Sequence, residues 1–286
     1  MSSNQVVAAV DVGATWIRGG LISNSEKIEL IQKVPARDSI LGKADPEFNR
    51  TREIVKELKI QAENNGFEIV AGCIGIPEYV DPSGKLLSSD QIDWTVQPLD
   101  FLPGLIDCPW VVESDVRCAA KAETKNYRDF LYVTVSSGIS HAMMINGEPL
   151  RGERGMAIGL GTMPSQTLGK SVEEVASGLG IARRYLEVSG KEKTTKEICG
   201  DLSDSQAVEI FEAATTELAI ALNRAVMILD PRQIIIGGGL WLGSARYREA
   251  TREKLKVSLG NFGTPEIIDA TVEDGALIGA SLFASK

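Results

Sequence analysis

The sequence has no long hydrophobic run and little cysteine, and each scarcity excludes a class of protein. It contains no run of about 18 or more apolar residues, so we expect no membrane-spanning helix. No basic, apolar leader opens the chain, since an apolar strand is predicted to begin at Val6. We therefore expect a cytoplasmic protein. The four cysteines are scattered and form no Cys-x-x-Cys pair, so neither a disulfide framework nor a cysteine-ligated zinc site is indicated.

Histidine is also scarce, and the 39 acidic residues outnumber the 30 basic ones. The single histidine, His141, allows no Ser–His–Asp triad and no His/Cys metal cluster, and we expect it to be structural. A net charge of −9 argues against binding a nucleic acid over a broad face. It still permits a local phosphate site made of backbone N–H groups and a metal ion. With 286 residues of ordinary globular composition, one large domain or two lobes are both allowed.

Two stretches of the chain begin in the same way, with a strand, a turn of small residues and a returning strand. The first covers residues 6–22, with its turn at 11–15, and the second covers residues 130–145, with its turn at 136–138. The second is closed by Asn146-Gly147, a strong hairpin-turn signal. Strands alternating with helices follow each beginning. This repetition predicts two α/β lobes of related design with a cleft between them.

The remaining helices and strands are predicted from hydrophobic periodicity and from capping and turn residues. The clearest is a helix over residues 205–229, whose apolar residues recur at steps of three and four. Ser171 and Glu174 form a capping box at the start of another helix. Residues 79–109 are expected to be rich in loops. The other predicted helices cover residues 46–65, 116–124, 171–189 and 275–284, and the other strands cover 69–76 and 233–236.

The first small-residue turn, Asp11-Val12-Gly13-Ala14-Thr15, carries groups suited to phosphate chemistry. A glycine allows the backbone to approach a phosphate, the Thr15 hydroxyl can donate to it, and the Asp11 carboxylate can hold a hydrated Mg²⁺. An ordinary hairpin also uses Asp and Gly for their conformations. A short glycine motif is therefore a weak signal by itself.

Two further turns have a similar character. Gly237-Gly238-Gly239 follows a run of three isoleucines, and such a run of glycines is tolerable where a ligand lies against bare backbone. A tight strand-to-helix connection is the alternative. Ser136-Ser137-Gly138 could hold a phosphate through its hydroxyl and N–H groups, or could be a plain polar turn.

Asp115 stands at the start of a predicted helix. The ordinary role of Asp at that place is to cap the helix. The functional alternative is a general base, which accepts the proton of an attacking hydroxyl during phosphoryl transfer. The sequence around Asp115 leaves both roles open.

Taken together and in order, these segments resemble the ROK family of sugar kinases, within the actin, Hsp70 and hexokinase superfamily. The resemblance spans nearly the whole chain, and its strength lies in the number and order of motifs. The segment 113–120 resembles the family's Glu-Asn-Asp-x-x-x-Ala-Ala, whose Asp is the catalytic base. The other matching segments are the two phosphate motifs at 11–15 and 133–138, the stretch beginning at 150–152, and the segments 176–178 and 230–239.

The resemblance implies a two-lobed actin-like ATPase fold, of ribonuclease H-like α/β type, with a central cleft. It implies a small lobe of residues 1–114 plus 273–286 and a large lobe of residues 115–272. It also implies ATP and Mg²⁺ as cofactors, with Asp115 as catalytic base and Asp11 holding the metal through water. The expected ATP-binding residues are Asp11, Gly13, Thr15, Ser136, Ser137, Gly138, Gly237, Gly238 and Gly239.

The sequence departs from the family pattern on the side that binds the acceptor. Where the family has Gly-Glu-x-Gly-His, this chain has Gly159 in place of the Glu and Thr162 in place of the His, a zinc ligand. Residues 163–177 contain no cysteine, so we expect no zinc. Ser114 replaces the Asn beside the catalytic Asp, and Ser136-Ser137 replaces Gly-Thr. The residues expected to bind the acceptor are Asp90, Ser114, Asp115 and Glu173.

The expected function is therefore an ATP-dependent kinase that phosphorylates a hydroxyl of a sugar or sugar-like polyol, cyclitols included. The alternatives are a glucokinase proper and a catalytically weak ROK-like sugar-binding or sensor protein. A ROK repressor would carry a DNA-binding arm before its first phosphate motif, and only ten residues precede Asp11. A dead kinase would be expected to lose Asp11 or Asp115, and both are present. The expected partner is a small sugar-like molecule, with no nucleic acid and no membrane, and a homodimer is left open.

Overall fold

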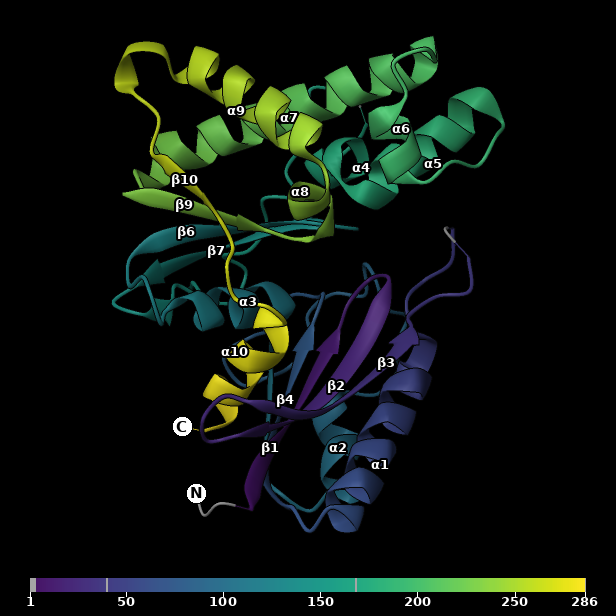
Figure 1. Ribbon diagram of the computed structural model, residues 1–286, viewed down its shortest axis with the longest axis vertical. Helices are drawn as coiled ribbons and strands as arrows, with labels where there is room; N and C mark the ends of the chain where they lie inside the picture. The colour runs from purple at the N-terminus through teal and green to yellow at the C-terminus, as the bar shows by residue number, and fades with distance from the viewer. Residues whose placement is uncertain (1–3, 40, 168, 286) are drawn as a thin grey trace. The chain divides into compact units, whose positions relative to one another are not determined.

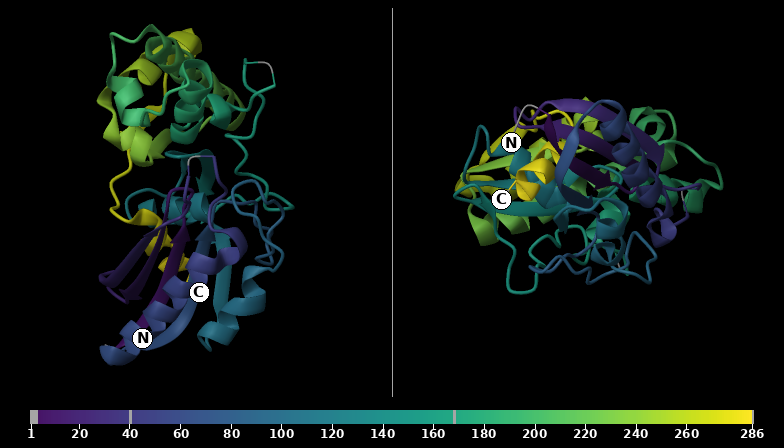
Figure 2. Two further views of the ribbon diagram at one scale, coloured as in Figure 1. Left: turned by 90° about the vertical axis from the view of Figure 1, so that its right-hand side faces the viewer. Right: turned by 90° about the horizontal axis from the view of Figure 1, so that it is seen from below.

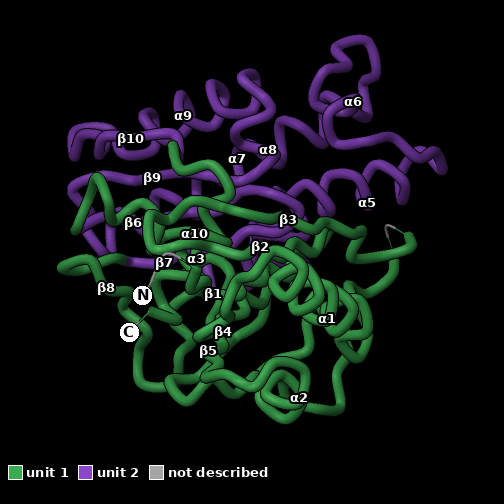
Figure 3. The backbone as a smooth tube through the Cα atoms, turned by 60° about the horizontal axis from the view of Figure 1, so that its bottom comes forward, with its two compact units in different colours: residues 1–128, 144–158, 271–286 green, residues 129–143, 159–270 purple. Residues whose placement is uncertain are grey.

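The computed structural model describes residues 4–39, 41–167 and 169–285, and its contacts divide the chain into two compact units (Figure 3). Unit 1 comprises Met1–Arg128, Met144–Ile158 and Thr271–Lys286. Unit 2 comprises Asp129–Met143 and Gly159–Ala270. By these contacts, helix α3 (Asp115–Glu123) belongs to unit 1, because it packs against α10 (Gly275–Ala284). The expected lobe division at residues 114 and 115 stays a prediction.

Unit 1 is built on a five-stranded sheet with the order β3-β2-β1-β4-β5 (Figure 1). The strands β1, β2 and β3 are antiparallel neighbours, whereas β1, β4 and β5 are parallel. Seven of the eight residues of β1 are buried, as expected for a central strand covered on both faces. The bounds are β1 Gln5–Val12, β2 Trp16–Ser23, β3 Ile28–Pro35, β4 Glu68–Ile76 and β5 Trp110–Ser114.

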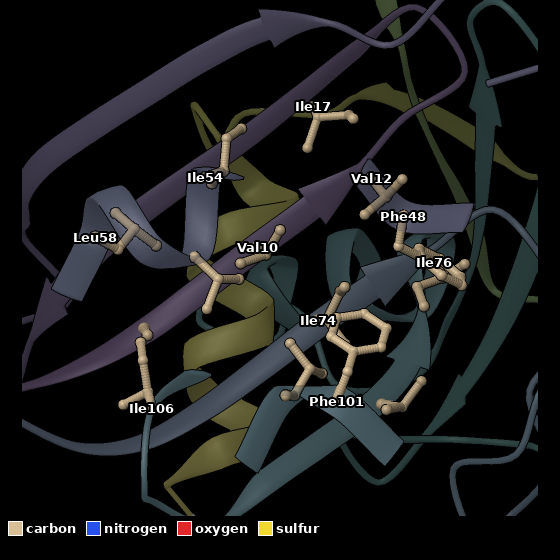
Figure 4. Packing of buried hydrophobic residues seen from close by; sticks show 14 of the residues in the cluster. Val10, Val12, Ile17, Phe48, Ile54, Leu58, Ile74, Ile76, Phe101 and Ile106 are labelled. Atoms are coloured by element: carbon tan, nitrogen blue, oxygen red, sulfur yellow. The ribbon is translucent and has the colours of Figure 1, made fainter. Parts of the chain in front are cut away.

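Helices cover both faces of this sheet, as the successive side chains of β1 require. Val10 and Val12 point into a core with residues of α1 (Asn49–Asn64) and α2 (Pro98–Leu105), such as Leu58 and Phe101 (Figure 4). Ala9 belongs to a second core with residues of α3 and α10. The views in Figures 1 and 2 agree that α1 and α10 lie on opposite faces of the unit 1 sheet.

The segment expected to be rich in loops, residues 79–109, contains α2, so that expectation is corrected in part. Pro98 stands at the start of the helix, where its missing N–H is no loss. The side chains of Gln97 and Asp100 complete a capping box before it. A short 3₁₀ helix, η1 (Pro46–Phe48), likewise precedes α1 where one helix was expected over 46–65.

The second sheet repeats the order of the first, with β10-β9-β6-β7-β8. Strands β6, β9 and β10 are parallel and β7 is antiparallel to β8, so each strand has a counterpart in the first sheet. The predicted repetition of two related α/β designs is therefore confirmed. Asn146 and Gly147 both have positive φ in the tight turn between β7 and β8, as the Asn-Gly signal predicts. The bounds are β6 Phe130–Val135, β7 Ile139–Ile145, β8 Glu148–Pro149, β9 Gln233–Gly237 and β10 Glu266–Asp269.

The helices of unit 2 include the predicted 205–229 helix with the same bounds, α7. The capping box of Ser171 and Glu174 is confirmed, but the helix expected over 171–189 is two helices. The break falls at Ser177, whose side chain accepts the N–H of Gly180 and so caps a second helix. In the part of the chain that is described, no helix has both the length and the apolar character to cross a membrane. The bounds are α4 Val172–Ala176, α5 Gly178–Ser189, α6 Thr195–Gly200, α7 Ser205–Leu229, α8 Gly239–Gly243, α9 Ala245–Leu259 and η2 Gly260–Phe262.

Candidate functional site

In unit 1, the parallel strands β1, β4 and β5 end at one edge of the sheet and carry the predicted carboxylates there. Asp11 of β1 is paired in register with Gly75 of β4, and Gly75 is paired with Glu113 of β5. Asp115 follows β5 directly, as the first residue of α3. Carboxyl ends of parallel strands at a sheet edge are a common place for ligand-binding groups. The structure therefore brings Asp11 and Asp115 to the same edge.

The turn after Asp11 depends on its glycine. The Gly13 N–H donates to the Trp16 carbonyl over 2.9 Å, and a Cβ at Gly13 would lie 2.8 Å from that oxygen. Thr15 is exposed, and its carbonyl accepts the N–H of Ala36 at 2.8 Å. The Arg37 Nε donates to the Ala14 carbonyl at 2.5 Å. The hydrogen bonds from Ala36 and Arg37 thus hold the backbone of the turn, and the Thr15 side chain lies at the surface.

Asp11 is buried and paired with a cation. Arg18 donates through Nε and Nη2 to the same oxygen, Oδ2, at 3.1 and 2.6 Å. Burial raises the pKa of Asp11, and the neighbouring Arg18 opposes that rise. Arg18 also donates to Asp274 at 2.6 Å, so the arginine is shared between two carboxylates. Within the described residues, Oδ1 of Asp11 has no hydrogen-bond partner, and an oxygen of this kind fits a hydrated Mg²⁺.

Asp115 is not the N-cap of α3, since that position belongs to Ser114. The capping role considered for Asp115 is therefore corrected. Asp115 lies in the first turn, half-buried, and its Oδ1 accepts the N–H of Val116 at 2.6 Å. Its predicted role as a general base stays a prediction.

Ser114 is buried, and its Oγ has no hydrogen-bond partner among the described residues. A buried hydroxyl without a partner is uncommon and calls for a ligand or an ordered water. Ser114 directly precedes Asp115 in the chain. Its predicted role in acceptor binding stays a prediction with this support.

Glu78, two residues after β4, organises the loop that contains Asp90, and sequence reasoning missed it. Its Oε1 accepts the N–H groups of Gln91 and Ile92 at 2.7 and 2.8 Å, and its Oε2 accepts that of Asp90 at 3.0 Å. The Asp90 side chain is exposed and has no partner among the described residues. Its predicted contact with the acceptor stays a prediction. The only sequence signal was a carboxylate just beyond a buried strand.

A second unpredicted group involves Glu113 and Arg117, which flank Asp115 in the chain. Glu113 and Arg117 are almost fully buried and form an ion pair of 2.6 Å, and Arg151 donates to the other oxygen of Glu113 at 2.5 Å. Arg117 also donates to the carbonyls of Val80 and Gly155. These contacts tie the Val80 segment and the 151–155 segment of unit 1 to the start of α3.

In unit 2, the two predicted small-residue turns lie against each other. A Cβ at Gly238 would lie 2.5 Å from the Val135 carbonyl, and Gly238 has a φ of +96°. Only glycine fits there without strain. A Cβ at Gly239 would lie 3.7 Å from the Ser136 Oγ. The Ser136–Gly138 turn and the Gly237–Gly239 run therefore lie side by side, with Gly239 exposed, Gly238 and residues 136–138 half-buried, and Gly237 buried. Their predicted contact with the nucleotide stays a prediction.

Glu173 is directed at the same turn, because its Oε2 accepts the Ile139 N–H at 2.8 Å. Its predicted contact with the acceptor is not shown and stays a prediction. His141 accepts the Leu160 N–H through Nδ1 at 3.2 Å, in keeping with a structural residue. Thr162 is exposed and donates to the Gly159 carbonyl at 3.1 Å. Across the described ranges, no group of three or more His, Cys, Asp or Glu side chains could hold a metal ion.

The chain is similar in sequence and structure to known proteins. The ROK family profile matches residues 7–286. A beta-glucoside kinase of Listeria monocytogenes is 26% identical over 96% of this chain and 95% of its own length. The structure of a ROK hexokinase from Thermus thermophilus is 26% identical, covers 98% of both chains and has a TM-score of 0.77. A ROK family glucokinase from Streptomyces griseus, in complex with glucose and AMPPNP, has a TM-score of 0.79 over 98% of this chain and 99% of its own. At 22% identity, this last likeness concerns the fold alone.

The predicted two-lobed actin-like ATPase fold is confirmed, and the predicted cleft between lobes stays a prediction.

Proposed function

This chain belongs to the ROK family, and we propose that it is an ATP-dependent kinase that phosphorylates a hydroxyl of a sugar or sugar-like polyol. The observation that carries the proposal is the edge of the unit 1 sheet, where Asp11 and Asp115 lie at the ends of β1 and β5, the two parallel strands on either side of β4. One carboxylate there suits a hydrated cation and the other suits a general base. A screen of sugars and cyclitols for ATP-dependent phosphorylation tests the proposal.

We assign separate tasks to the residues of the two units. In unit 1, the Asp115 carboxylate accepts the proton of the acceptor hydroxyl, and the Ser114 Oγ orients that hydroxyl. Asp11 holds a hydrated Mg²⁺ through Oδ1, while Arg18 keeps its Oδ2 in place. In unit 2, the 136–138 turn and the 237–239 glycines receive the nucleotide. Bound ATP·Mg²⁺ would supply the phosphoryl group and part of the charge neutralisation that an acidic protein needs.

We expect the loss of the Asp11 side chain to weaken Mg²⁺-dependent turnover sharply. Asp11→Ala removes the oxygen that fits the hydrated metal and leaves Arg18 with Asp274 as its remaining partner. The expected fall in kcat/KM is about 10²-fold or more. Steady-state kinetics at several Mg²⁺ concentrations measure it, with the exposed Asp107→Ala as a matched control. Activity unchanged at limiting Mg²⁺ would refute the metal assignment.

We further propose that the acceptor is a polyol or sugar-like ring other than plain glucose. Ser114, Gly159 and Thr162 are smaller than the family residues they replace, so several hydrogen bonds to glucose hydroxyls are missing and a larger ring has room. Each lost hydrogen bond weakens binding by about 0.5–1.5 kcal/mol. The beta-glucoside kinase named above acts, by its name, on a substituted glucose.

For glucose we accordingly expect a kcat/KM below about 10⁴ M⁻¹s⁻¹, the low end for ordinary enzymes. The reason is the loss of three hydroxyl partners, which raises KM. Coupled-assay kinetics with glucose and with substituted sugars measure it. A glucose value above that limit would support the glucokinase alternative. Sugar binding by calorimetry without ADP formation for any acceptor would instead support the sensor alternative.

A further inference from the structure

The described residues of the 163–171 loop, which are 163–167 and 169–171, connect the Gly159–Thr162 segment to Glu173 in unit 2. The two ends of the loop are paired, since the N–H of Val172 donates to the Met163 carbonyl and that of Glu173 to the Gly161 carbonyl, both at 2.9 Å. A bridge between Pro164 and Ser171 continues this pairing. Glu173 follows the loop by two residues in the chain, and its N–H is bonded just before the loop begins, at Gly161.

Side chains of α7, the long helix of unit 2 in Figure 1, hold the loop. Glu217 accepts the Gln166 N–H through Oε2 at 3.0 Å. Arg224, two turns further along α7, donates to the Pro164 carbonyl at 3.3 Å. Both contacts reach backbone atoms of the loop and so fix its path.

Burial of Glu217 is unfavourable for the stability of the fold. It is only 3% exposed, and its Oε1 has no hydrogen-bond partner among the described residues. A buried carboxylate with an unpaired oxygen costs stability, whereas an apolar side chain of similar shape would not. The carboxylate accepts the Gln166 N–H, and an apolar side chain could not accept this hydrogen bond.

We propose that Glu217 is a positioning residue that anchors the 163–171 loop and thereby sets the place of Glu173 for the acceptor. The effect on the acceptor rests on the proposed function, but the anchoring does not. The two can therefore be tested separately.

The anchoring is tested by trypsin cleavage after Lys170 in the native full-length protein, followed by mass spectrometry. Glu217→Met keeps the length of the side chain and removes the acceptor of the Gln166 N–H. We expect cleavage at least about tenfold faster, because proteolysis follows the population of the open loop. The melting temperature should stay level or rise, since the unpaired oxygen is gone. Glu212→Met, an exposed change on the same helix, is the matched control and should behave as wild type.

A conservative variant guards against a folding defect. Glu217→Gln retains an oxygen that accepts the Gln166 N–H, and we expect it to restore cleavage to within a few-fold of wild type. Cleavage after Lys170 that is equally slow in wild type and Glu217→Met would overturn the proposal. A large fall in melting temperature with unchanged cleavage would also overturn it, because Glu217 would then be a core residue only.

The second half is tested by the kinetics of the best acceptor found in the screen. For Glu217→Met we expect KM for the acceptor to rise about fivefold or more, with KM for ATP near the wild-type value. Equal rises in both constants, or no rise for the acceptor, would overturn the link to acceptor binding. If the wild-type protein phosphorylates no acceptor, the proposed function fails, and the cleavage comparison still decides whether Glu217 anchors the loop.

Discussion

Replacing Asp115 with Asn is expected to lower kcat by about 10²- to 10⁴-fold, with nucleotide affinity nearly intact. Asn keeps the size of the side chain and the oxygen that accepts the Val116 N–H, but it cannot accept a proton from a substrate hydroxyl. Since Ser114 and not Asp115 is the N-cap of α3, the helix loses no cap in this variant. Steady-state kinetics with the best acceptor, together with calorimetric titration of nucleotide, measure the two effects.

Asp100→Asn is a matched control for this experiment. Asp100 also lies in the first turn of a helix, α2, where its side chain accepts the Gln97 N–H at 3.1 Å. We expect that change to leave kcat within a few-fold of wild type. An Asp115→Asn enzyme with the same small effect would show that Asp115 is structural, and the proposed catalytic base would have to be given up.

Replacing Arg117 with Met is expected to lower the free energy of unfolding by about 3–5 kcal/mol. Arg117 is fully buried and neutralises Glu113 at 2.6 Å, so its removal leaves a buried carboxylate with Arg151 as its remaining cation. The carbonyls of Val80 and Gly155 lose a donor as well. Urea denaturation followed by circular dichroism measures the change.

Arg128→Met is the control for that prediction, because Arg128 is exposed and its side chain donates to the Asn146 carbonyl at 3.0 Å. Its expected effect is within about 0.5 kcal/mol. The double change Glu113→Leu with Arg117→Met should recover part of the lost stability, since the uncompensated charge is then absent. A loss as small for Arg117→Met as for Arg128→Met would mean that the buried ion pair adds little.

The elements that could be predicted from the sequence are those whose own pattern is strong. The 205–229 helix was predicted to the residue because its apolar positions repeat regularly and a proline follows it. Helix α2 was missed because Pro98, Pro103 and Gly104 are typical of loops. It forms since Phe101 and Leu102 are buried in the core with α1, a tertiary effect that local propensity cannot reveal.

The same distinction applies to the candidate site. Asp11, Asp115 and the glycine turns could be proposed from the sequence because each lies in a short motif that is continuous in sequence. The network of Glu113, Arg117 and Arg151 was not found, because the Glu113–Arg151 pair joins residues 38 positions apart. No spacing rule connects such residues before the fold is known. Glu78 was missed for the same reason, since its partners lie 12 to 14 positions away in a loop without periodicity.

The composition of unit 1 from three separate segments has a consequence for the order in which a nascent chain matures. Strands β1 and β4 and helix α3 are synthesised long before α10, yet α10 completes the apolar cluster that contains Ala9, Cys73 and Cys118. Until α10 emerges from the ribosome, that face of the sheet lacks its cover. The segments of unit 2 are complete at Ala270, before α10 begins. Domains of growing chains usually mature from the N-terminus onward. Here the unit that is begun first is the one that is finished last.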